Sequence, residues 1–70
     1  MKRYQVIVYD HESGVDERFS YETQKKANKV ARHYHRHIDY EGALVYDLQE
    51  HRTITVYGFI PQAAMPIEFV

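Results

Sequence analysis

The stretch TQKKANKVARHYHRHID, residues 23–39, has the clearest helical periodicity in the chain and decides the fold. Its apolar residues recur at i, i+3, i+4, i+7 and i+11, which places them in one stripe along a helix. Thr23 is the expected N-cap, because its hydroxyl can accept a hydrogen bond from a free amide of the first turn. A single amphipathic helix cannot bury its stripe alone, so the flanking segments must supply a sheet. The stripe consists of Ala27, Val30, Ala31, Tyr34 and Ile38.

The opposite side of this helix is basic over about three turns. No acidic residue falls between Gln24 and Ile38. Solvated helix faces usually mix charges, because opposite charges four residues apart stabilise a helix. We therefore interpret this face as a binding surface for nucleic acid or an acidic protein, with an ordinary solvated face as the alternative. Its cations are Lys25, Lys26, Lys29, Arg32 and Arg36.

Four segments alternate in the way strands do: residues 3–9, 17–22, 43–48 and 53–59. They are rich in β-branched and aromatic residues, which strands prefer. The order hairpin, helix, hairpin predicts an α+β domain of ββαββ type, with one helix packed across a four-stranded sheet. We expect residues 1–60 to form this single domain, because 70 residues lie near the lower limit for one core.

The predicted sheet has a second face that the helix does not cover. If Tyr4, Val6, Leu44 and Tyr46 face the helix, an apolar, tyrosine-rich patch remains outside, and small monomers rarely leave such a patch bare. The C-terminal tail, residues 61–70, is expected to pack on this sheet or at a dimer interface. A partner protein, or single-stranded bases stacking on tyrosines, are the other interpretations. The outer residues would be Ile7, Tyr9, Val45, Thr55 and Tyr57.

The layout resembles the β-grasp immunoglobulin-binding domains of streptococcal protein G over residues 3–58. The similarity lies in the Glu41-Gly42 entry to the third strand, the Tyr46-Asp47 pair and the strand Thr53-Ile54-Thr55-Val56. The resemblance implies a mixed sheet with the first and fourth strands parallel at its centre. An all-antiparallel sheet with the third strand beside the first is the competing topology. The implied core is Tyr4, Val6, Ala27, Val30, Tyr34, Leu44, Tyr46, Ile54 and Val56.

The ligand of that family does not transfer to this chain. The family grips antibody with an exposed edge of its helix and third strand, where a tryptophan is central. This chain has no tryptophan, and Leu44 stands near that place. The resemblance therefore implies a shared fold without a shared ligand.

Catalytic and metal chemistry have little support in the sequence. His33 and His37 are one helical turn apart and are the candidate metal ligands, but two histidines do not complete a zinc site. There is no cysteine, and the glycines are scattered rather than gathered in a phosphate-binding loop. We expect no enzyme, no cofactor and no metal site.

The remaining features favour a cytoplasmic binding protein. The chain has no cysteine, no segment that reads as a secretory signal and no apolar run near the roughly 20 residues that span a bilayer. The expected function is protein–protein interaction through the basic helix face or the outer sheet face, with a protein partner or a homodimer. The alternative is nucleic-acid binding through the basic face, and metal-dependent activity through the helix histidines is the outsider.

Overall fold

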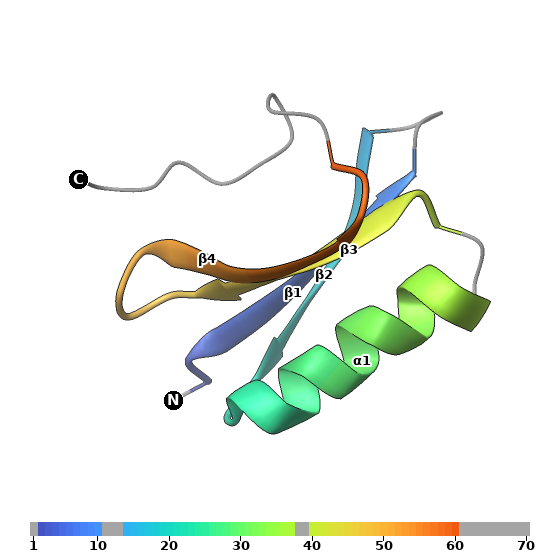
Figure 1. Cartoon of the computed structure of the whole chain (residues 1–70). Coiled ribbons are helices and arrows are strands. Elements are labelled where there is room, and N and C mark those ends of the chain that lie inside the picture. Colours follow the sequence, from blue (N-terminus) through green and yellow to red (C-terminus); the bar gives the residue numbers. More distant parts are fainter. Residues whose placement is uncertain (1, 11–13, 38–39, 61–70) are drawn as a thin grey trace.

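The computed structural model describes residues 2–10, 14–37 and 40–60. Its element order is β1 (Tyr4–Asp10), β2 (Gly14–Tyr21), α1 (Gln24–His37), β3 (Gly42–Asp47) and β4 (Arg52–Gly58), as Figure 1 shows. The predicted α+β class and ββαββ order are confirmed. β1, β3 and β4 lie within one residue of their predicted bounds, whereas β2 begins three residues earlier.

The four strands form one antiparallel sheet in the order β2-β1-β3-β4. The mixed sheet with the first and fourth strands parallel at its centre was therefore wrong, and the competing antiparallel topology is the one present. β1 pairs with β3 in a register that sets Val6 opposite Val45 and Ile7 opposite Leu44. This register gives the two central strands matching apolar residues on both faces of the sheet.

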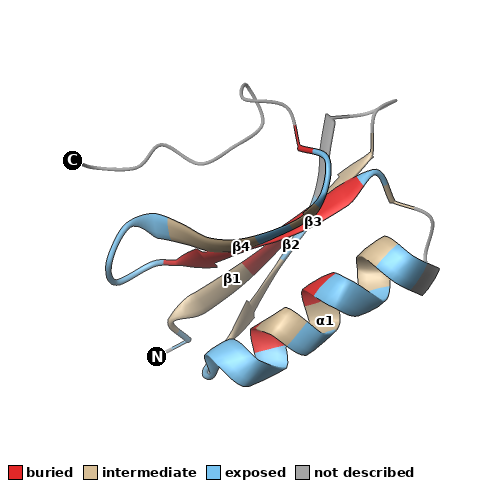
Figure 2. Ribbon diagram, in the orientation of Figure 1, coloured by how far each residue is buried: buried red, intermediate tan, exposed pale blue. Residues whose placement is uncertain are grey.

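The first core lies between the sheet and α1, which covers one face (Figure 1). Val6 of β1 packs there as predicted, and Val8 packs there as well. Ala27 and Ala31 of α1 are fully buried, and their small side chains let the helix backbone approach the sheet closely. Figure 2 shows buried segments on the sheet and on the side of α1 that faces it.

The predicted faces of β3 and β4 were wrong. Ala43 and Val45 face the helix, whereas Leu44 and Tyr46 belong to a separate cluster on the other side of the sheet. Directly paired residues of antiparallel strands share a face, and Val45 pairs with Val6 of the helix-facing set. The expectation that the bulkier face of β3 meets the helix failed because the pairing register, not side-chain size, sets the face.

The same register places two residues of β4 on the opposite face of the sheet from the predicted one. Thr55 pairs with Val45 and Tyr57 pairs with Ala43, so both lie on the helix side rather than the outer side. Tyr57 packs against the first core, and so does Ile54, beside the irregularity between Val45 and Tyr46. Val56 pairs with Leu44 and is an exposed side chain of β4, not part of the helix-side core.

A second cluster fills the face away from the helix. It contains Ile7, Leu44, Tyr46 and Ile60, with Tyr9 packed against it. Ile7 and Leu44 expose none of their surface. The predicted tail and its division from the domain at residue 60 stay a prediction, because residues 61–70 lie outside the described part of the chain.

Gly42, at the start of β3, pairs with Gly58, at the end of β4. A Cβ on Gly42 would meet the backbone carbonyl group of Phe59, whose carbon lies 2.8 Å from that position, so only glycine lets the chain cross there. Gly58 has a φ of 72°, and a Cβ there would lie 2.7 Å from Nδ1 of His35. The Phe59 amide then donates a hydrogen bond to the Glu41 carbonyl oxygen, at 3.1 Å.

Thr23 is the N-cap of α1, as predicted. Its hydroxyl oxygen accepts a hydrogen bond from the Lys26 amide at 3.2 Å, and its carbonyl oxygen accepts one from the Ala27 amide. The helix continues to His37, and the predicted last turn with Ile38 and Asp39 falls outside the described residues.

Candidate functional site

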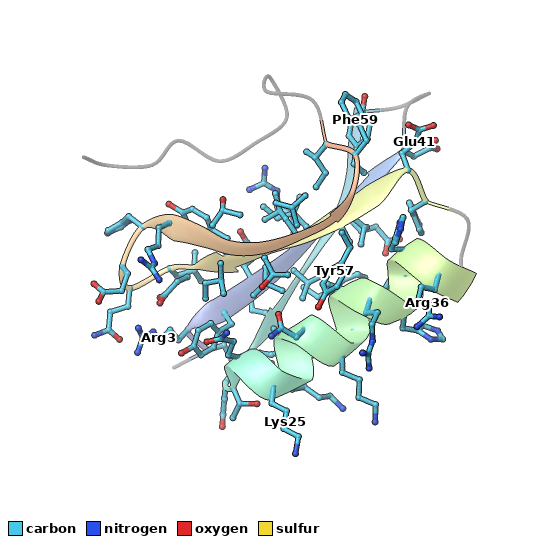
Figure 3. The ribbon with its side chains drawn as sticks, viewed as in Figure 1. Arg3, Lys25, Arg36, Glu41, Tyr57 and Phe59 are labelled. Carbon is cyan, nitrogen blue, oxygen red and sulfur yellow. The ribbon has the colours of Figure 1, made fainter. Side chains whose placement is uncertain are left out.

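The five predicted cations lie exposed along α1, as the sequence indicated. We call Lys25, Lys26, Lys29, Arg32 and Arg36 the basic face. Figure 3 shows Lys25 and Arg36 near opposite ends of the helix. At 1.5 Å per residue, the eleven steps between them span about 16 Å.

The charges of the basic face are not neutralised within the described part of the chain. The one ion pair formed among the described residues joins Arg3 to Asp47 and involves none of the five cations. The first turn of α1 contains no acidic residue, although the helix dipole favours acids there. Lys25 and Lys26 occupy that turn, so the helix carries positive charge where its own backbone disfavours it.

Two hollows open on the basic face. One, of about 210 Å³, is lined by Lys29, Arg32, His33 and Arg36. The other, of about 340 Å³, is lined by Lys25, Asn28, Lys29, Arg32 and Tyr57. Lys29 and Arg32 line both hollows, and no carboxylate is among the described residues that line either. The two hollows therefore form one positively charged surface centred on Lys29 and Arg32.

The larger hollow, which we call the helix–edge groove, joins α1 to β4. Tyr57 supplies its β4 side, and β4 is an outer strand of the sheet. Within the described strands, β4 pairs with β3 alone. Asn28 stands in the helix wall, and its Oδ1 is shielded from solvent without a hydrogen-bond partner among the described residues.

A second polar cluster lies at the Asp47 corner, where β1 begins and β3 ends. The Arg3 guanidinium donates two hydrogen bonds to the Asp47 carboxylate, at 2.9 and 2.7 Å. The backbone amides of Gln49 and Glu50 donate to Asp47 Oδ1 at 2.9 and 3.1 Å. The Asp47 side chain is 5% exposed. Its hydrogen bonds connect the β3–β4 turn to the start of β1.

These contacts shift the ionisation of both partners. The Arg3 hydrogen bond, helped by the two backbone amides, holds the pKa of Asp47 well below its usual range, although burial opposes the shift. The same hydrogen bond raises the pKa of Arg3, whose guanidinium also lies 5.2 Å from the Tyr4 ring centroid. Asp47 is therefore an ionised structural anchor.

The three helix histidines lie in different surroundings. His33 is exposed on the small hollow, with its ring 6.2 Å from that of Tyr34 in an edge arrangement. His35 is half-buried against Gly58, and its Nδ1 is shielded without a hydrogen-bond partner in the described structure. The side chain of His37, the second candidate metal ligand, lies outside the described part. Among the described residues, no three histidine or acidic side chains gather as metal ligands.

The predicted outer patch does not exist as one surface. Val45, Thr55 and Tyr57 lie on the helix side, whereas Ile7 and Tyr9 lie on the outer side. Ile7 is fully buried and Tyr9 is half-buried, so neither offers a bare apolar face. Asn28 was not predicted as a site residue, and Tyr57 was predicted on the wrong face. Asn28 follows Lys25 by three residues and precedes Arg32 by four, a spacing that places all three side by side.

Comparison with known proteins identifies no relative of this chain. No protein-family model, curated protein or solved structure matches the chain. Among the described helices, none has the length and apolar character needed to cross a bilayer.

Proposed function

We propose that this chain is a small, non-enzymatic, cytoplasmic binding module that recognises an acidic segment of a partner protein through the basic face of α1. The observation that carries the proposal is the position of Lys29 and Arg32, which line both hollows. Neither residue has an ion-pair partner among the described carboxylates. Two exposed cations with adjoining space can receive carboxylates without first breaking an internal ion pair.

Charge distribution favours a short protein segment. The basic face covers only about 16 Å along the helix, whereas the whole chain has a net charge of −1. A long duplex would extend past the basic face and meet the remaining, largely acidic surface. An acidic peptide of a few residues matches the size of the basic face without that repulsion.

Nucleic acid is the second candidate, and the smaller hollow favours it. Lys29, Arg32 and Arg36 line that hollow with His33 beside them. Arginine matches the geometry of phosphate oxygens, so this hollow suits one backbone phosphate. Binding of this kind should weaken steeply with added salt, because counterions are released from nucleic acid.

An amide NMR titration separates the two candidates. The probes are an octaglutamate peptide and an eight-residue thymidine oligonucleotide, each at about 50 and 200 mM salt. We expect octaglutamate to shift amides of residues 25–36 and to bind more tightly than the oligonucleotide. Stronger binding of the oligonucleotide would replace the protein partner by nucleic acid, and unchanged spectra with octaglutamate would overturn the proposal.

A matched pair of charge reversals locates the interaction. Arg32→Glu reverses a shared residue of the two hollows, and Arg18→Glu makes the same change on an exposed residue of β2. We expect Arg32→Glu to weaken octaglutamate binding by about tenfold, since a charge-assisted contact becomes a repulsion. Arg18→Glu should weaken it by less than about threefold, and equal losses would remove the basic face as the site.

A further inference from the structure

We propose that the acidic segment recognised by this chain carries a phosphorylated side chain, and that its phosphate monoester occupies the smaller hollow between Lys29, Arg32 and Arg36. This inference rests on the proposed function and names the chemical class of the partner segment. Its basis is that three cations line one hollow of about 210 Å³. None of the three forms an ion pair with a described carboxylate.

The helical spacing brings these three cations together. Lys29, Arg32 and Arg36 lie at positions i, i+3 and i+7 of α1, so Arg32 neighbours each of the others on one face. The rise from Lys29 to Arg36 is about 10.5 Å, a distance that the long side chains at both ends can close toward Arg32. All three residues are exposed. A ligand group above Arg32 can therefore contact all three cations.

The number of donors around the hollow suits a phosphate monoester. A phosphorylated side chain carries a charge of about −1.5 to −2 at pH 7 and has three acceptor oxygens. A carboxylate carries one charge on two oxygens, and an internal phosphate of nucleic acid also carries one charge. Two arginines and a lysine leave donors unused around a single carboxylate, whereas each of the three can bind one oxygen of a phosphate monoester.

The side chains, rather than the helix backbone, must supply the attraction. Arg36 is in the last turn of α1, where the helix dipole places about half a negative charge. That partial charge stabilises the arginine but opposes a bound anion. The three full positive charges of the hollow exceed it, so binding depends on the individual cations. Neutralising one of them should therefore have a measurable effect on the affinity for phosphate.

The helix–edge groove provides room for acidic residues beside the phosphorylated one. It shares Lys29 and Arg32 with the smaller hollow, whereas Arg36 lines only the smaller hollow and Lys25 lines only the groove. The rise of about 16 Å from Lys25 to Arg36 equals about five residues of extended chain at 3.3 Å each. A phosphorylated residue with acidic neighbours on one side therefore matches the length of the basic face.

The experiment compares three acidic peptides that differ in phosphate and in charge. The test probe is an eight-residue peptide of seven glutamates and one phosphoserine, and the second probe is the same peptide with unmodified serine. The third is nonaglutamate, which matches the charge of the phosphopeptide without a phosphate. Titration calorimetry with the whole chain should show the phosphopeptide binding at least about tenfold more tightly than either of the others.

A matched pair of variants locates the phosphate. Arg36→Gln neutralises a cation that lines the smaller hollow alone, and Lys25→Gln neutralises one that lines the helix–edge groove alone. Arg36→Gln should reduce the preference for phosphopeptide over nonaglutamate to about threefold or less, whereas Lys25→Gln should retain the preference. The preference is a ratio of two affinities for one variant, so a general change in the protein does not alter it. An equal reduction by both variants would overturn the inference.

The remaining outcomes separate this inference from the proposed function. If the phosphopeptide and nonaglutamate bind wild type equally and Arg32→Glu weakens both, the phosphate site is wrong and the proposed function stands. If a 5′-phosphorylated thymidine oligonucleotide binds more tightly than the phosphopeptide, the hollow takes the phosphate of a nucleic acid and the inference is overturned. If no acidic peptide binds, both the inference and the proposed function are wrong.

Discussion

The Asp47 corner and the basic face of α1 use charge in opposite ways. At the corner, one buried carboxylate receives four hydrogen bonds from a guanidinium and two backbone amides. On the basic face, five exposed cations have no ion-pair partner among the described carboxylates. The corner joins β1 to β3, whereas the basic face joins no two elements.

This difference separates structural charge from charge available to a ligand. Buried charges are tolerated when they are paired and hydrogen-bonded, and removing one partner then costs stability. Exposed like charges on a helix lower its stability by a few tenths of a kcal/mol each. On the basic face, no ion pair within the described part of the chain offsets this loss. Substitutions at the corner should therefore change stability, and substitutions on the basic face should change binding.

The largest expected effect is at the corner. Asp47→Ala leaves the Arg3 guanidinium and two amides without their acceptor, and we expect a loss of about 3 kcal/mol in the free energy of unfolding. Urea denaturation followed by circular dichroism measures it. Glu50→Ala is the control, since Glu50 is exposed in the same turn. A loss below about 1 kcal/mol for Asp47→Ala would remove the distinction between the two regions.

Acid should destabilise the corner through the same carboxylate. The pKa of Asp47 is lowered in the folded protein, so its contribution is complete above the unfolded pKa of about 3.9 and declines as pH falls below it. The decline is at most about 1.4 kcal/mol per pH unit for one group. We expect the free energy of unfolding of Asp47→Asn to fall less than that of the wild type between about pH 4 and pH 2. Parallel pH profiles would contradict this assignment.

The N-cap of α1 is expected to contribute to the stability of the fold. Thr23 satisfies the Lys26 amide at a helix end that has no acidic residue in its first turn. Thr23→Ala should lower the free energy of unfolding by about 1 kcal/mol. Thr23→Ser, which keeps the hydroxyl, is the matched variant and should retain most of the stability. Equal losses for the two variants would show that the hydroxyl is not the cause.

The smallest expected effect is a gain, rather than a loss, in the free energy of unfolding. Lys25→Glu places an acid in the first turn and creates a Glu–Lys pair with Lys29 four residues on, so we expect a gain of about 0.5 kcal/mol. The same variant should bind octaglutamate more weakly than wild type. Lys25→Gln, which removes the charge without adding an acid, should give an intermediate result in both measurements. A variant that gained stability without losing binding would place Lys25 outside the site.

Local pattern was sufficient to predict the elements of this fold. The four alternating segments became the four strands, and Thr23 gave the start of α1. The faces of β3 were not predictable in this way. Leu44 and Val45 are both fully buried, so alternation between apolar residues carries no information about which face the helix covers.

The candidate site was predictable only in part, because some of its residues come together only through the order of the strands in the sheet. The basic face follows from helical spacing alone, since all its residues are on one element. The helix–edge groove depends on which strand lies at the sheet edge, and Tyr57 reaches it only because β4 does. The contact of Asp47 with Arg3 was likewise not predictable, because Arg3 lies 44 residues away and meets Asp47 only when β1 lies beside β3.

The pairing of β1 with β3 also has a consequence for the order of folding. The hairpins β1–β2 and β3–β4 are local and can form early, whereas the contact between Arg3 and Asp47 closes a loop across 44 residues. Closing a chain of that length costs about 3 kcal/mol of entropy before its contacts form. We therefore expect the seam between the two hairpins to form late in folding, and the groove to form only after it.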